Sequence, residues 1–130
     1  MKHRRILSVA ICVLLIASFT IISFAASATF FTQTVYGYRC TGRGSISLST
    51  ATSTLNAETI PNQQHIPSND CSASAWVTAY GSNGQYLGSE HVTGKTFAKA
   101  TIEGRSPIKY IKCGFDFTGT HFDIFTLYNS

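Results

Sequence analysis

The chain has 130 residues, of which 44% are hydrophobic and 12% charged, and its formal net charge is +4 at pH 7. Three of its ten Lys and Arg residues lie within the first five positions. Beyond residue 28 there are seven basic and six acidic residues, so this part of the chain has a net charge of +1. These seven basic residues are scattered singly along the sequence, whereas a surface that binds the phosphate backbone needs clustered Lys and Arg. The composition therefore argues against a nucleic-acid partner.

The start of the chain is predicted to be a secretory signal peptide. Basic residues in the first five positions precede an apolar run at 6–24, and the small residues Ala26-Ser27-Ala28 form a cleavage signal. We expect residues 1–28 to be removed and residues 29–130 to form one domain that is secreted into the extracellular medium. Cleavage after residue 25 or 26 is an open alternative. A retained leader, long enough to anchor the protein in a membrane, is the other.

Beyond the leader, the hydrophobic period is two, and Ser, Thr, Gly and aromatic residues replace the usual helix formers. This pattern is typical of an all-β fold. Seven short strands in about 100 residues predict a small antiparallel β-sandwich. The predicted strands are 31–40, 45–55, 73–81, 85–92, 96–103, 108–117 and 121–128.

The dipeptide Asn83-Gly84 predicts a two-residue type I′ hairpin turn. In that register Tyr80 faces Leu87 and Trp76 faces His91, so that Trp76, Tyr80 and Leu87 share one face of the ribbon. Both faces carry apolar side chains, and the pattern does not decide which of them is the core face. The opposite face holds Ala75, Val77, Ala79, Tyr86 and Val92.

Residues 56–72 form the one long predicted loop, rich in Pro, Asn and Gln and carrying His65. Loops of this length inside a compact domain are usually functional or mobile. We interpret it as a contact surface, with a mobile connector as the alternative.

Three cysteines beyond the leader, Cys40, Cys71 and Cys113, allow at most one internal disulfide in an exported protein. The three possible loops of about 32, 43 or 74 residues differ by only about 0.7 kcal/mol in the chain-entropy model. Because Cys40 and Cys113 both continue apolar alternations within predicted strands, a Cys40–Cys113 bridge is favoured. The other pairings and three free thiols stay open. No Cys-x-x-Cys motif or His pair at ligand spacing indicates a metal.

Few residues are suited to acid–base catalysis, and we assign no catalytic residue and no cofactor. Glu90 and His91 are adjacent on a predicted strand and therefore point to opposite faces. His121 and Asp123 do share a face, but a polar strand edge accounts for them equally well. A small secreted hydrolase is the third functional hypothesis, and it requires His91 or His121 to meet a carboxylate in a pocket.

Fourteen of the residues beyond position 28 are Phe, Tyr or Trp. Tyr and Trp combine an apolar ring with a polar group, which suits stacking on sugars or anchoring a protein partner. We therefore expect a non-enzymatic binding or cell-surface interaction module for an extracellular protein or glycan. Its candidate contact residues are Trp76, Tyr80 and His65.

A leader followed by a Ser/Thr-rich β domain resembles the small exported proteins of Gram-positive bacteria. Ala98-Lys99-Ala100-Thr101, in a late strand, is similar to the lactococcin-972-like bacteriocins. That resemblance implies a bacterial origin, a compact β-sandwich and, as the alternative function, a secreted antimicrobial protein. It assigns no functional residue.

Overall fold

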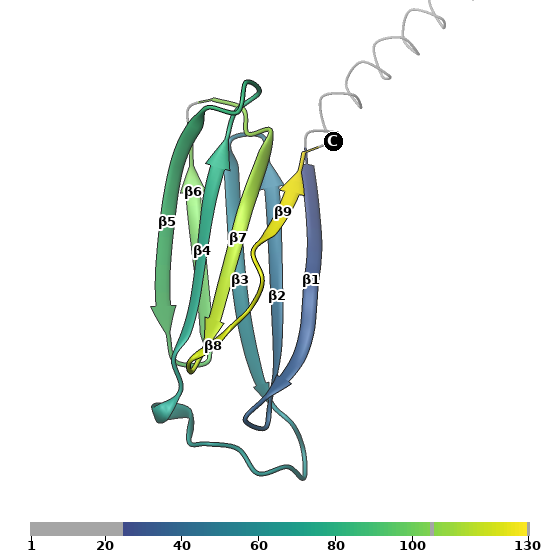
Figure 1. Cartoon of the computed structure of the whole chain (residues 1–130), viewed down its shortest axis with the longest axis vertical. Coiled ribbons are helices and arrows are strands. Elements are labelled where there is room, and N and C mark those ends of the chain that lie inside the picture. The colour runs from purple at the N-terminus through teal and green to yellow at the C-terminus, as the bar shows by residue number, and fades with distance from the viewer. Residues whose placement is uncertain (1–24, 105, 130) are drawn as a thin grey trace, which may run out of the picture.

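A computed structural model describes residues 25–104 and 106–129. There, two antiparallel sheets pack face to face, which confirms the predicted all-β sandwich (Figure 1). The four-stranded sheet has the order β1 (Ala25–Val35), β2 (Tyr38–Ser47), β3 (Thr50–Thr59), β6 (Phe97–Glu103). The five-stranded sheet has the order β5 (Tyr86–Gly94), β4 (Ala73–Tyr80), β7 (Tyr110–Phe117), after which β8 (Thr120–His121) and β9 (Phe125–Tyr128) both pair with β7. One short 3-10 helix, η1 (Ser68–Asp70), precedes β4.

Most of the predicted leader, residues 1–24, lies outside the described residues. Residues 25–28, which the sequence assigns to the end of the leader, form the first part of β1 and pair with residues 44–47 of β2. Cleavage after Ala28 would therefore shorten this edge strand by four residues. No helix in the described ranges is long and apolar enough to cross a membrane.

The strand order follows that of immunoglobulin-like sandwiches. Strands β2, β3 and β6 correspond to A, B and E, and β5, β4, β7 and β9 to C′, C, F and G, with β1 added at the edge. Antibody domains bury a Trp of strand C against a disulfide between strands B and F. Here Trp76 of β4 is on the outer side, and Ser53 of β3 and Cys113 of β7 take interior positions.

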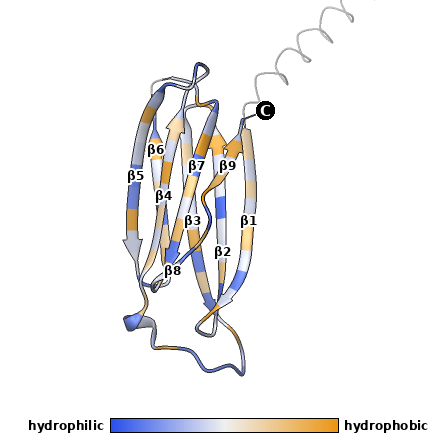
Figure 2. Ribbon diagram, in the orientation of Figure 1, coloured by the Kyte–Doolittle hydropathy of each residue, from blue (hydrophilic) through white to orange (hydrophobic). Residues whose placement is uncertain are grey.

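The inner face of β4 consists of small side chains. Hydrophobic and hydrophilic residues alternate along the strands (Figure 2), and Ala75, Val77 and Ala79 have no exposed surface. The core face left undecided by the sequence pattern is therefore the alanine face, and the Trp76 face is the solvent side. On the facing strand β6, Ala98 and Ala100 are also buried, so the two sheets meet here through small residues.

Larger side chains fill the other half of the core. Phe115 has no exposed surface, and its ring contacts those of Phe30, Phe31 and Phe125 at centroid distances of 5.4–6.3 Å. Phe30 also stacks on Phe125 at 4.9 Å, which joins the outermost strands of the two sheets.

The hairpin between β4 and β5 differs from the prediction. Gly81 N–H donates to the Gln85 carbonyl at 2.9 Å, Gly84 N–H donates to the Gly81 carbonyl at 3.0 Å, and Gly84 has a φ of 76°. These contacts define a three-residue loop of the type I plus bulge class. Tyr80 consequently pairs with Tyr86 instead of Leu87.

A register shift beyond Tyr80 then restores the expected pairing, so that Trp76 faces His91 as predicted. Three of the predicted strands are interrupted by turns, because residues 31–40, 45–55 and 121–128 each span a chain reversal or break. The paired positive φ values that type I′ turns need occur instead at Tyr36-Gly37 and Thr118-Gly119.

Replacing Phe115 by Ala should lower the free energy of unfolding by about 3–5 kcal/mol, because the cavity removes ring contacts in both sheets. Urea denaturation followed by circular dichroism measures the change. Phe97→Ala is the matched control, since Phe97 is 52% exposed, and it should stay within about 0.5 kcal/mol of the wild type. A loss below about 1 kcal/mol for Phe115→Ala would contradict this packing.

Candidate functional site

Four tyrosines form a continuous row across the outer face of the five-stranded sheet. Tyr86 of β5 pairs with Tyr80 of β4, Tyr80 pairs with Tyr110 of β7, and Tyr110 pairs with Tyr128 of β9. Tyr86 and Tyr128, at the two ends, are each 64% exposed, while the central pair is partly buried. The row therefore presents a phenol-lined strip to solvent.

The rings of this row contact one another directly. Tyr80 and Tyr110 stack at 4.8 Å with an interplanar angle of 11°, and Tyr110 and Tyr128 lie 5.4 Å apart at 34°. Tyr86 meets Tyr80 edge-on at 6.5 Å, and the Lys112 ammonium lies 5.8 Å from the Tyr80 ring centre. Because the stacked rings cover each other's faces, the row offers mainly ring edges and hydroxyls to a ligand.

Trp76 supplies the flat surface that the tyrosines lack. A Cβ built on Gly114 of β7 would lie only 1.8–2.1 Å from three atoms of the indole, so the ring lies directly over this glycine. His91 stands against the indole at 5.7 Å and 84°. One indole face thus rests on the sheet, and the partly exposed ring is available for stacking from the solvent side.

Hydroxyl groups lie between these aromatic rows. Thr78 and Ser89 form a cross-strand pair with a 3.2 Å hydroxyl contact, and they lie between the tyrosine row and Trp76. Beyond Trp76, Ser74 and Thr93 repeat the arrangement at 3.1 Å. We call this surface the aromatic face, defined by Trp76, Tyr80, Tyr86, Tyr110 and Tyr128.

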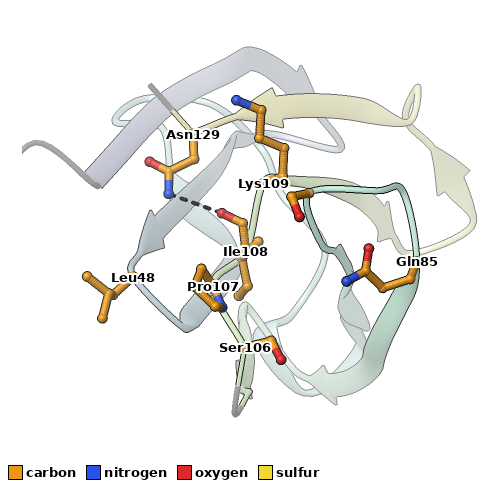
Figure 3. A pocket seen from close by; sticks show the side chains of 8 residues that line it. Leu48, Gln85, Ser106, Pro107, Ile108, Lys109 and Asn129 are labelled. Carbon is orange, nitrogen blue, oxygen red and sulfur yellow. Dashed lines mark hydrogen bonds between the residues drawn. The ribbon is translucent and has the colours of Figure 1, made fainter.

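A hollow of about 570 Å³ opens at the end of the sandwich beside the tyrosine row (Figure 3). Its floor includes Ile108, whose carbonyl accepts a hydrogen bond from Asn129 Nδ2 at 3.1 Å. Gln85, Lys109 and Asn129 each adjoin a tyrosine of the row in sequence. The lining has no histidine or carboxylate, and consists of Leu48, Ser82, Gln85, Ser106, Pro107, Ile108, Lys109 and Asn129.

The structure places two of the three predicted contact residues together. Trp76 and Tyr80 lie on the same outer face of β4, whereas His65 lies in the β3–β4 loop at the opposite end of the sandwich from Tyr80 (Figure 1). His65 is exposed and meets the Tyr38 ring edge-on at 5.2 Å. It is therefore separate from the aromatic face.

The described histidines, His65, His91 and His121, lie outside the lining of the hollow in Figure 3. His121 makes an ion pair with Asp116 on the exposed side of the five-stranded sheet, instead of joining Asp123. His91 contacts Trp76, as the register predicted. Within the described ranges, no group of three or more His, Cys, Asp or Glu residues is arranged to hold a metal ion.

The predicted Cys40–Cys113 disulfide is not formed, and all three described cysteines are free and buried. The Cys113 thiol faces Gly44, where an added Cβ would lie 3.1 Å from Sγ. Gly44 is four residues from Cys40 on β2, about 13 Å along an extended strand. A disulfide needs Cα atoms within about 7 Å. The sequence alternation placed both cysteines on inner faces but could not show this displacement along the strand.

Comparison with known proteins leaves the family open. No protein-family model matches the chain, and no curated protein matches it. A crystal structure described as a β-galactosidase of Bacteroides fragilis is similar over 81% of this chain, with 11% sequence identity and a TM-score of 0.34. The chain spans 15% of the length of that protein, and the likeness carries no conclusion about activity.

Sequence reasoning missed three members of the aromatic face, Tyr86, Tyr110 and Tyr128. Tyr86 was placed on the opposite face because the hairpin bulge was not anticipated. Tyr110 and Tyr128 join the row only because β7 pairs with β4 and with β9, and the pairing of β7 with β4 brings together segments that are distant in sequence.

Gly114→Ala should displace the Trp76 indole, because the new methyl group would overlap the ring. We expect a red shift of tryptophan emission and a stability loss of about 1–3 kcal/mol. Trp76 is the chain's single tryptophan, so its fluorescence reports this site alone. Gly104→Ala is the control, since a Cβ there meets only ordinary contacts at 3.5 Å or more. Equal emission spectra for both variants would refute the placement of the ring.

The reduced protein should lose stability as pH rises from 9 to 11. Burial raises the pKa of Cys113 from 9.0 to about 11, with a smaller opposing effect of the Ser53 hydroxyl. The thiol ionises first in the unfolded chain, so its contribution is complete below pH 9 and is lost toward pH 11. The slope of unfolding free energy against pH should be steeper for the wild type than for Cys113→Ala, by up to about 1.4 kcal/mol per pH unit. Identical slopes would show that the thiol is accessible to water.

Proposed function

We propose that this chain is an exported glycan-binding module whose ligand lies on the aromatic face. The observation that carries the proposal is the Trp76 indole, laid flat over Gly114 and open on its solvent side, with four tyrosines in register on the same sheet. Export rests on the basic and apolar leader with its small-residue cleavage signal.

The alternation of surface chemistry favours a sugar chain over other ligands. A pyranose ring has an apolar face of C–H groups and an edge of hydroxyls. The aromatic face likewise alternates rings with the hydroxyls of Thr78, Ser89, Ser74 and Thr93. Aromatic planes provide the apolar contact, and hydroxyl pairs provide donors and acceptors in fixed positions.

The length of the aromatic face favours an oligosaccharide. Trp76 and Tyr80 are four residues apart on β4, about 13 Å along the strand. Two contact points at this separation suit several linked sugar residues better than a single one. On this side of the sheet the Lys112 ammonium stands alone and the Asp116 carboxylate is paired with His121, which supports a neutral or N-acetylated glycan.

Binding can be tested by calorimetric and fluorescence titration with cellohexaose and chitohexaose, and by cosedimentation with insoluble cellulose, chitin and bacterial peptidoglycan. We expect saturable binding to at least one of these, with a change in Trp76 emission. Trp76→Ala should weaken the affinity at least tenfold, measured by calorimetry, because stacking surface is lost.

Phe97→Ala is the control for this experiment, since it removes an exposed aromatic ring from the other sheet. It should bind as the wild type does. Absence of binding to all five glycans by the folded protein, or equal affinity of wild type and Trp76→Ala, would overturn the proposal.

A further inference from the structure

The β3–β4 loop folds back over the beginning of β2. Tyr38 of β2 has no exposed surface, and its hydroxyl donates a hydrogen bond to the Ile66 carbonyl at 2.7 Å. The same hydroxyl lies 3.3 Å from the Ser68 Oγ. Tyr38 therefore fixes the position of the loop segment that leads into Cys71.

Cys71 directly follows η1 and turns inward. It is 3% exposed, and its thiol donates to the Pro67 carbonyl at 3.5 Å. It is also a neighbour of the Tyr38 phenol. The Ser68 hydroxyl lowers the pKa of Tyr38, but desolvation and the Cys71 thiol outweigh it and raise that pKa. The loop thus delivers one buried thiol to the inner face of β2.

Cys40 provides a second buried thiol, on the inner face of β2. It lies two residues after Tyr38, so both side chains project from the same face of β2, and Cys40 has no exposed surface. Burial, together with a smaller effect of the Cys71 thiol, raises the pKa of Cys40 from 9.0 to about 11. Cys113 is remote from this cluster, since its thiol faces Gly44.

We propose that Cys40 and Cys71 form an intramolecular disulfide that fastens the β3–β4 loop to β2. In forming it, the two thiols give up two protons and two electrons, and one S–S bond replaces two S–H bonds. The oxidant is a disulfide, either of a thiol oxidoreductase or of glutathione, whose own S–S bond is reduced to two thiols. A mixed disulfide is the intermediate, and the second cysteine displaces the oxidant from it.

Burial of the two thiols determines at which stage the disulfide forms and that it forms within one molecule. Neither thiol can reach the cysteine of another protein in the folded chain, so the pair closes within one molecule. Because both thiols are inaccessible to an oxidant in the folded chain, oxidation proceeds during folding, before the loop covers them.

Tryptic mapping gives an unambiguous test, because cleavage after Lys and Arg leaves Cys40, Cys71 and Cys113 on separate peptides, 40–43, 44–95 and 113–130, and Cys12 on another, 6–39. The full chain is refolded in a glutathione redox buffer, denatured, alkylated and digested without reduction. We expect peptide 40–43 to be linked to 44–95, and 113–130 to be alkylated. Linkage of 40–43 to 113–130, or alkylation of all three peptides, would overturn the proposal.

Variants and heating provide the controls. Cys113→Ser should retain the 40–43 to 44–95 linkage, whereas Cys71→Ser should leave 40–43 alkylated. A closed loop of about 32 residues should raise the melting temperature by roughly 10–20 °C relative to the same protein under reductant. Cys71→Ser should melt at one temperature with or without reductant. A wild type insensitive to reductant would count against the bond even if linked peptides were found in trace amount.

Discussion

Small side chains on the inner face of β4 are the constraint from which the aromatic face follows. Successive residues of a strand point to opposite sides of the sheet. Ala75 and Ala79 are fully buried and face the buried alanines of β6, so their neighbours along β4 lie on the outer side. Trp76 and Tyr80 must therefore face solvent. The absence of a side chain at Gly114 then lets the indole lie down on the sheet instead of standing away from it.

On the side of β1 and β9, the core is filled by large phenylalanine rings instead of small side chains. There Phe30, Phe31, Phe115 and Phe125 fill the space between the sheets and join their outermost strands. The core is thus graded from small residues at β4 and β6 to large rings at β1 and β9. This division explains how a domain of about 100 residues accommodates so many aromatic residues. Half of them build the core, and others are left for the outer surface.

The sequence predicted the sandwich, the outward–inward alternation of β4 and the Trp76–His91 pairing, because these depend on period-two patterning within neighbouring segments. It did not predict the row of tyrosines, which requires knowing that β7 lies between β4 and β9. Nor did it separate Cys40 from Cys113, because strand patterning shows which face a cysteine occupies and not its height along the sandwich. Of the three predicted contact residues, Trp76 and Tyr80 lie together on the aromatic face, and His65 lies at the other end of the sandwich.

The place of Tyr86 at one end of the tyrosine row depends on a bulge in β5. Without the register shift near Leu87 and Gly88, Tyr80 would face Leu87, and Tyr86 would point to the other side of the sheet. The predicted turn and the observed loop with its bulge contain the same number of residues, so a change of turn type alone, without insertion or deletion, moves Tyr86 from one face of the sheet to the other. Substitutions at Ser82, Asn83 or Gly84 that favour another turn type can therefore remove Tyr86 from the aromatic face, while Trp76, Tyr80, Tyr110 and Tyr128 keep their places because β4, β7 and β9 set them.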